Sequence, residues 1–101
     1  MKTNPILTGD ERLTVLSTLP DWHMVDGRDA IRRRMRFDSF SAAIAFMGRA
    51  VPVIEAMNHH PEWSNVYDRI DVVLTTHDNG RGESGLTRLD IELAAALDAL
   101  L

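Results

Sequence analysis

Residues 54–77 read IEAMNHHPEWSNVYDRIDVVLTTH, and the hydrophobic pattern changes its period within this stretch. Up to His60 the apolar residues recur at helical spacing, whereas from Trp63 they alternate as in a β-strand. Pro61 marks the boundary, because proline disfavours helical geometry at the residue before it. We therefore expect a helix that ends near His60, a strand that begins at Trp63 and a second strand over residues 70–77.

The helix before this boundary is long and broadly apolar. Asp38 is a suitable N-cap, and Pro52 lies inside the helix, where it should kink the helix or remove a hydrogen bond. Two neighbouring lines of the helix carry mostly apolar residues: Phe40, Ile44, Met47, Val51, Ile54 and Asn58 on one, and Phe46, Ala50, Val53 and Met57 on the other. This arc is wider than one sheet needs to cover, so we expect part of it to meet another subunit.

Helices are also expected near both ends of the chain. Thr8 and Glu11 have the spacing of a capping box, which predicts a first helix over residues 9–18. Thr87 and Asp90 repeat this spacing at the start of a last helix. The apolar stripe of that last helix comprises Leu89, Leu93, Leu97 and Leu100.

Residues 22–37 have the pattern of a β-hairpin. Strands over residues 22–25 and 30–37 flank the turn Asp26-Gly27-Arg28-Asp29, and the Asp-Gly pair is a strong hairpin signal. Three arginines of the second strand point to the same side: Arg32, Arg34 and Arg36. They fit either a solvated face of the sheet or a site for an anion or an acidic partner.

The order helix, strand, strand, helix, strand, strand, helix indicates an α+β fold: a four-stranded antiparallel sheet covered by helices on one face. No linker or repeat divides the chain, so we expect residues 1–101 to form a single domain. A formal charge of −4 argues against direct binding to nucleic acid or to an anionic membrane. The longest uninterrupted apolar run, residues 42–47, is far shorter than the roughly 20 residues that span a bilayer, so a cytoplasmic protein is expected.

The chain contains no cysteine, which excludes disulfides, thiolate metal sites and a cysteine nucleophile. Histidine then becomes the main candidate for chemistry near neutral pH, because its ordinary pKa is about 6.5. Three histidines fall where a helix or strand should end: His59, His60 and His77. Glu55 lies four residues before His59, and we expect it to share a helical face with that imidazole and to orient it.

Each candidate also has a simpler interpretation. The His59-His60 pair fits a helix C-terminus favoured by the helix dipole, and His77 fits a strand end in a polar loop. Asp90 is explained as a capping partner of Thr87. The two tryptophans, Trp22 and Trp63, are more typical of packing than of a stacking platform. Zinc could in principle use three histidines and a carboxylate, but their spacing is unlike that of known zinc motifs.

Three motifs together closely resemble the pterin-4a-carbinolamine dehydratase family. They are the stretch from Glu55 to Tyr67, the run Leu74-Thr75-Thr76-His77, and the run Gly85-Leu86-Thr87-Arg88-Leu89-Asp90. Further matches near residues 19–22, 30–33 and 37–40 extend the resemblance over nearly the whole chain. The resemblance implies a small α+β subunit that assembles as a homodimer or homotetramer.

The resemblance also implies an activity. The family removes water from a 4a-hydroxytetrahydropterin to give a quinonoid dihydropterin. This reaction belongs to tetrahydrobiopterin recycling beside phenylalanine hydroxylation, and it needs neither a metal nor an organic cofactor. By position, the resemblance implies that His59, His60 and His77 are catalytic and that Glu55, Pro61, Trp63 and Asp90 bind the substrate. Within the catalytic set, His59 and His77 match the acid–base histidines and His60 the substrate-positioning histidine.

One segment departs from the family pattern. Residues 79–84 enlarge the loop after His77, where the family usually has a shorter turn. Such a loop fits a lid, a change in the pterin side chains that are tolerated, or a loose surface turn; the last is favoured because glycine-rich polar insertions are usually tolerated without function. Two other functions remain open for this sequence: a protein-interaction module, such as a transcriptional coactivator or assembly factor, and a metal-dependent hydrolase.

Overall fold

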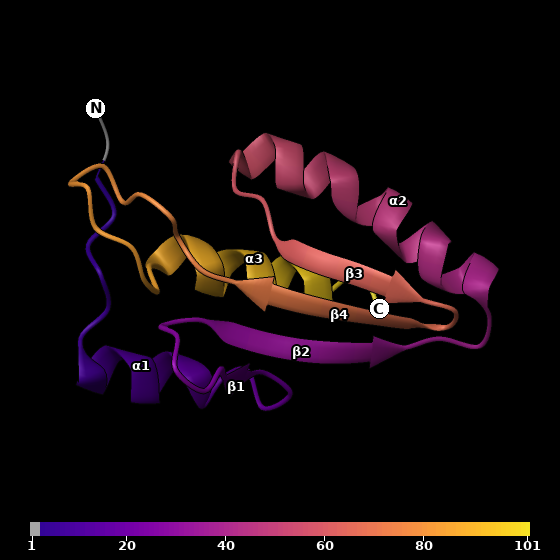
Figure 1. Ribbon diagram of the computed structural model, residues 1–101, viewed down its shortest axis with the longest axis horizontal. Coiled ribbons are helices and arrows are strands. Elements are labelled where there is room, and N and C mark those ends of the chain that lie inside the picture. The colour runs from indigo at the N-terminus through magenta and orange to yellow at the C-terminus, as the bar shows by residue number, and fades with distance from the viewer. Residues whose placement is uncertain (1–2) are drawn as a thin grey trace.

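A computed structural model describes residues 3–101, and in this range it contains three helices and four strands in the predicted order (Figure 1). The helices are α1 (Gly9–Leu16), α2 (Phe40–Met57) and α3 (Arg88–Asp98). The strands are β1 (His23–Met24), β2 (Ile31–Arg36), β3 (Glu62–Val66) and β4 (Arg69–Leu74). The predicted α+β class is therefore confirmed.

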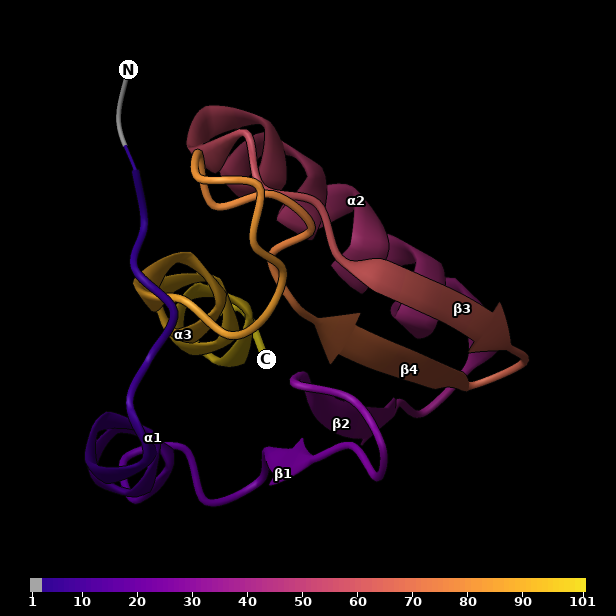
Figure 2. The same cartoon turned by 60° about the vertical axis from the view of Figure 1, so that its left-hand side comes forward.

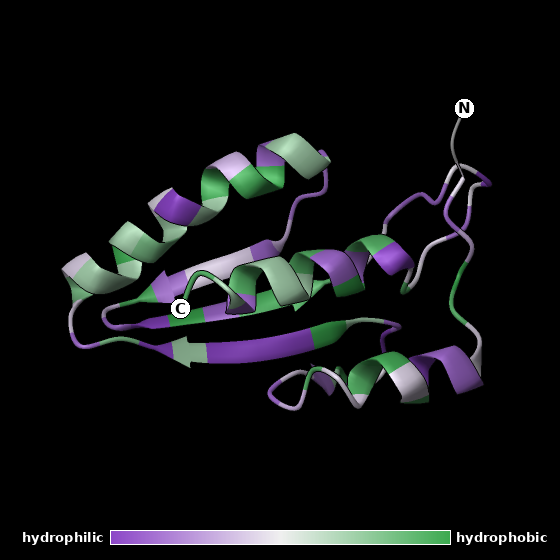
Figure 3. Cartoon of the chain, turned by 180° about the vertical axis from the view of Figure 1, so that it is seen from behind, coloured by the Kyte–Doolittle hydropathy of each residue, from purple (hydrophilic) through white to green (hydrophobic). Residues whose placement is uncertain are grey.

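The strands form one antiparallel sheet in the order β1-β2-β4-β3. Ile31 pairs with Leu74, and Glu62 pairs with Val73. As a result β2 begins, β3 begins and β4 ends at the same end of the sheet. Helix α3 lies behind the sheet in Figure 1 and in front of it when the molecule is seen from behind in Figure 3, and α2 packs against both α3 and β4. Helices α2 and α3 thus cover one face, as predicted, whereas α1 has no buried residue.

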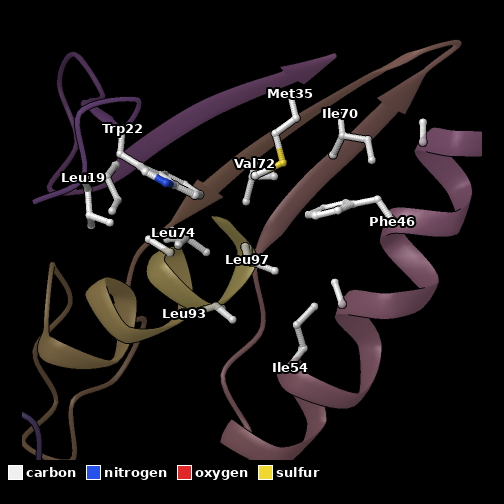
Figure 4. Packing of buried hydrophobic residues seen from close by; sticks show 14 of the residues in the cluster. Leu19, Trp22, Met35, Phe46, Ile54, Ile70, Val72, Leu74, Leu93 and Leu97 are labelled. Atoms are coloured by element: carbon white, nitrogen blue, oxygen red, sulfur yellow. The ribbon is translucent and has the colours of Figure 1, made fainter. Parts of the chain in front are cut away.

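The hydrophobic core lies between this covered face of the sheet and the two longer helices (Figure 4). Its largest buried side chains alternate along the central strands and recur along the helices: Ile31, Met35, Ile70, Val72, Leu74, Phe46, Ile54, Leu93 and Leu97. Trp22 also belongs to this core, and its indole N–H donates to Asp98 over 2.9 Å. The packing interpretation of Trp22 is therefore confirmed. The arginines Arg32, Arg34 and Arg36 point to the opposite, exposed face.

Both ends of α2 differ from the prediction. Ser39 is the N-cap instead of Asp38, and its hydroxyl accepts a hydrogen bond of 3.0 Å from the N–H of Ala42. At the other end α2 stops at Met57, before His60, because Asn58 adopts a left-handed conformation with a φ of 48°. Asparagine is one of the few residues that adopt this conformation readily. It ends the helix without the help of Pro61.

The interior of α2 is continuous through Pro52, which lies on the exposed side of the helix. On that side the predicted apolar excess is present, since Phe40, Ile44 and Val51 are exposed. The opposite side, which includes Phe46, is buried in the core. By length and by a mean hydropathy of 1.4, α2 would also qualify as a membrane-spanning helix, a test that a core helix of a soluble protein can equally pass. The longest uninterrupted apolar run, residues 42–47, is too short to indicate that the whole helix passes this test.

Three further elements are shorter than predicted. Helix α1 ends at Leu16 and not at residue 18, and β1 has only two residues. Strand β4 ends at Leu74. After Leu74, the only β-type pairing within the described residues is the isolated bridge between Thr76 and Gly85. The reason is the register: β2 begins opposite Leu74, so β4 has no neighbouring strand beyond that point. The capping boxes of α1 and α3 are both present as predicted.

Candidate active site

The predicted site residues come together at the end of the sheet where β4 ends. The C-terminal end of α2 leads into β3 there, and the β1–β2 turn and the N-terminus of α3 reach the same end. The register brings these segments together, since Glu62, Val73 and Arg32 are neighbours across three strands. In Figure 2 the loop that follows β4 lies beside the C-terminal end of α2.

His59 is held by a buried carboxylate. Its side chain is nearly buried, with the residue 8% exposed, and its Nε2 lies 2.6 Å from Oδ1 of Asp90, which is 0% exposed. The other oxygen of Asp90 accepts hydrogen bonds from the Thr76 hydroxyl at 2.9 Å and from the Thr87 N–H at 3.0 Å. The capping role of Asp90 is thus confirmed, but it is only half of what this side chain does. Because an ionised carboxylate only accepts, Nε2 of His59 donates and Nδ1 is the nitrogen left for a ligand.

Glu55 does not contact His59, so the expectation that the two share a helical face is wrong. The helix ends at Met57, and the left-handed turn at Asn58 takes the following residues off the helical path. Oε1 of Glu55 instead lies 3.1 Å from Nε2 of His60, and both side chains are exposed. Residues four positions apart share a helical face only where the helix is continuous, and α2 ends before His59.

His77 also has a carboxylate partner. Its side chain is 71% exposed, and its Nε2 lies 3.4 Å from Oε2 of Glu62. Glu62 is itself held by Arg28, whose two terminal nitrogens donate to Oε1 at 2.9 Å and to Oε2 at 2.7 Å. These hydrogen bonds hold the pKa of the Glu62 carboxyl below its usual value, with smaller contributions in the same direction from the charges of Arg28 and His77. The same pair raises the pKa of Arg28.

A shallow pocket of about 190 Å³ lies beside His77. It is lined by Arg28, Asp29, Thr75, His77, Ser84 and Gly85. Asp29 is fixed there, because its carboxylate accepts from the guanidinium of Arg12 and from the N–H of Leu86. Gly85 has a φ of 149° and lies so close to Asp29 that a Cβ would clash with the carboxylate. Glycine is thus required at this wall of the pocket. A more apolar groove between α1 and α3 contains no histidine.

The remaining predicted residues follow His60 in the chain: Pro61 comes directly after it, and Trp63 is the second residue of β3. Pro61 and Trp63 are half-buried, and Trp63 packs partly against the hydrophobic core. Sequence reasoning missed Arg28, Glu62 and Thr76. Strand alternation could have found Glu62, because residues of β3 out of step with Trp63 face away from the core. No local pattern could have found Arg28, which pairs with a residue 34 positions away.

The enlarged loop over residues 79–84 is a surface turn, because residues 80–84 are exposed, and hydrogen bonds of Asn79 close it. Asn79 is 1% exposed, and its side-chain oxygen accepts from the N–H groups of Arg81 and Glu83 at 2.9 and 3.2 Å. Its side-chain nitrogen donates to the carboxylate of Glu83, and its own carbonyl accepts from the N–H of Asn4. The loop therefore closes on a buried asparagine and is attached to the N-terminal segment. Within residues 3–101, no three histidine, aspartate or glutamate side chains are grouped to hold a metal ion.

The link between Arg28 and Glu62 leads to a direct prediction. Arg28→Ala should raise the pKa of Glu62 towards its ordinary value, because the hydrogen bonds from Arg28 are the largest cause of the depression. A carbon-13 NMR titration of the Glu62 carboxyl measures this. A depressed folded-state pKa means that the pair stabilises the fold above the unfolded-state pKa and that this contribution is lost as the pH falls through the folded-state value. Arg34→Ala, which removes a partner of Asp71 on the same face, is the control and should leave Glu62 unchanged.

Comparison with known proteins identifies relatives of this chain by sequence and by structure. A family model described as pterin 4 alpha carbinolamine dehydratase matches residues 5–100. Proteins of Rhizorhabdus wittichii and Burkholderia multivorans, both provisionally named pterin-4-alpha-carbinolamine dehydratase, are 52% and 53% identical over 94 residues; the alignments cover 93% of this chain and 93% and 88% of theirs. A crystal structure from Brucella melitensis, described as a transcriptional coactivator/pterin dehydratase, matches with a TM-score of 0.87 and 43% identity, covering 95% of this chain and 98% of the other.

Proposed function

This chain belongs to the pterin 4 alpha carbinolamine dehydratase family, and on that premise we propose that it removes water from a 4a-hydroxytetrahydropterin. The observation that carries the proposal is that three imidazoles at one end of the sheet each face a different carboxylate through Nε2. The pairs are His59 with Asp90, His60 with Glu55, and His77 with Glu62. A carboxylate at one ring nitrogen orients an imidazole and stabilises its protonated form, which prepares the other nitrogen for proton transfer.

The reaction needs two proton transfers and no change of oxidation state. The C4a–O bond breaks, its electron pair leaves with the oxygen, and a proton from a general acid turns the leaving hydroxide into water. The proton on N5 passes to a general base, and its electron pair forms the C4a=N5 double bond of the quinonoid dihydropterin. One imidazole therefore loses a proton while another gains one, and solvent exchange restores both.

We assign these transfers to His59 and His77 and the positioning of the substrate to His60. Asp90 has no exposed surface, so it acts on the substrate through His59 rather than by contact. The half-buried Trp63 and Pro61 supply an apolar wall for the planar ring at the same end of the sheet. We place the activity in the recycling of tetrahydrobiopterin beside phenylalanine hydroxylation in the cytoplasm.

The test is a dehydratase assay on freshly generated 4a-hydroxytetrahydropterin, followed by the change in absorbance as the quinonoid product forms. We expect the protein to accelerate the reaction over the uncatalysed background, and the double variant carrying His59→Ala and His77→Ala to return to that background. Equal rates with and without the protein would refute the proposal. Full activity of the double variant would refute the histidine mechanism.

A second function, that of a protein-interaction module, is favoured by one specific observation. The exposed side of α2 carries Phe40, Ile44 and Val51, and a solved relative is described as a transcriptional coactivator as well as a pterin dehydratase. An apolar surface of this kind suits a homodimer or homotetramer, or a protein partner. Analytical ultracentrifugation of the wild type and of an Ile44→Glu variant tests this: assembly should be lost in the variant, and identical monomeric profiles would contradict it.

A further inference from the structure

We propose that Glu62, held in place by Arg28, is the positioning residue of His77 during proton transfer. The inference rests on the dehydratase function proposed above and adds two residues to its machinery. Neither residue was among the predicted site residues. Arg28 lies in the β1–β2 turn, Glu62 begins β3, and His77 follows β4, so three separate segments meet in this contact.

The geometry of Glu62 distinguishes it from an ordinary surface carboxylate. Two hydrogen bonds from one guanidinium, at 2.9 and 2.7 Å, fix both the position and the plane of the carboxylate. Oε2, the oxygen of the shorter bond, is also the atom that lies 3.4 Å from Nε2 of His77. The carboxylate is therefore already in place before His77 takes up a charge.

Comparison of the three imidazole–carboxylate pairs supports this assignment. Asp90 is fixed by Thr76 and by the Thr87 N–H, in addition to its contact with His59. For Glu55, within residues 3–101, the contact with His60 is the only hydrogen bond of the carboxylate. Glu62 thus resembles Asp90 in having its orientation fixed by independent donors. The two histidines assigned to proton transfer are those with a fixed carboxylate, and the histidine assigned to substrate positioning is not.

The chemistry gives Glu62 a definite task. When His77 accepts a proton at the nitrogen that faces away from Glu62, positive charge spreads over the ring, and the carboxylate near Nε2 stabilises it. When His77 donates a proton, the same contact keeps the neutral ring in its orientation. Arg28 keeps the carboxylate ionised and stops it from rotating to another partner. A glutamine at position 62 would keep the size of the side chain and lose the charge.

A double-mutant cycle tests the inference. We expect Glu62→Gln to lower kcat at least about tenfold, the usual effect of removing a carboxylate that orients a functional imidazole, with KM changed less than about twofold. In the His77→Ala background the same substitution should have no further effect, because Glu62 acts through His77. Arg28→Ala should lower kcat by a smaller factor, since the carboxylate stays but loses its anchor. Circular dichroism establishes that each variant is folded.

Asp71→Asn is the matched control. Asp71 lies on the same exposed face of the sheet and forms an ion pair with Arg34 at 2.7 Å, but it has no histidine partner within residues 3–101. We expect its kcat to equal that of the wild type. The inference is wrong, while the dehydratase function stands, if the wild type is active and the kcat of Glu62→Gln equals that of Asp71→Asn. It is also wrong if Glu62→Gln lowers kcat by the same factor in the His77→Ala background. A wild type without dehydratase activity overturns both.

Discussion

Replacing His59 by alanine is expected to lower kcat/KM for dehydration of a 4a-hydroxytetrahydropterin at least about 100-fold, the usual effect of losing a general acid or base. The size of the effect follows from the burial of this imidazole and its 2.6 Å contact with Asp90. A water molecule in place of the imidazole would be a poor substitute in the proton transfer, because it would be oriented by only one hydrogen bond that it donates to Asp90. His77→Ala should cost about as much, since the mechanism needs one proton donor and one proton acceptor.

His23→Ala is the control for both substitutions. His23 lies exposed on β1, and within residues 3–101 its side chain makes no hydrogen bond or ion pair. Steady-state kinetics of the three variants, each checked for its thermal midpoint, separate loss of chemistry from loss of fold. If His59→Ala and His23→Ala retain equal activity, His59 is not part of the chemistry.

Asp90→Ala is expected to destabilise the protein more than any other single change in the site, by about 3 kcal/mol. Three donors lose a buried acceptor at once: the Nε2–H of His59, the hydroxyl of Thr76 and the N–H of Thr87. Each unsatisfied buried donor costs about 1 kcal/mol or more. For a chain of this size the melting temperature should fall by about 12–24 °C, which differential scanning calorimetry measures.

The other capping box of the protein offers a matched control for Asp90. Glu11 occupies the equivalent position of α1, where its carboxylate accepts from the N–H of Thr8 at 2.8 Å. It is exposed and has no histidine partner within residues 3–101. Glu11→Ala should therefore cost no more than about 1 kcal/mol. Equal destabilisation by the two substitutions would show that Asp90 contributes only as a helix cap.

The elements of this fold could be predicted because their signals act over a few residues. The capping boxes formed by Thr8 with Glu11 and by Thr87 with Asp90 are both present, and the alternation around Val72 places the core as expected. The errors arise where a residue far away in the chain, or the backbone conformation of a single residue, determines where a helix or strand ends. Strand β4 stops at Leu74 because β2 begins opposite it, which no pattern within β4 could reveal.

The errors at the site have the same origin. The four-residue spacing predicted a contact between Glu55 and His59. Because of the left-handed turn at Asn58, Glu55 contacts His60 instead. The actual partner of His59 is Asp90, 31 positions further along the chain. The hydrogen bonds of the buried Asn79, which close the loop over residues 79–84, also could not be predicted from its glycine-rich composition.

Local signals in the sequence were sufficient to predict the order of the elements and the face of the sheet that carries the core, and they selected the three histidines that we propose take part in the reaction. These properties follow from helix capping, from the period of apolar residues and from the motif, all of which are local. The three-dimensional structure was needed to show which carboxylate faces which imidazole and that Arg28 holds Glu62. Those pairings depend on which ends of the strands and helices meet. That meeting is set by the register of the sheet and the packing of the core, which join residues far apart in the chain.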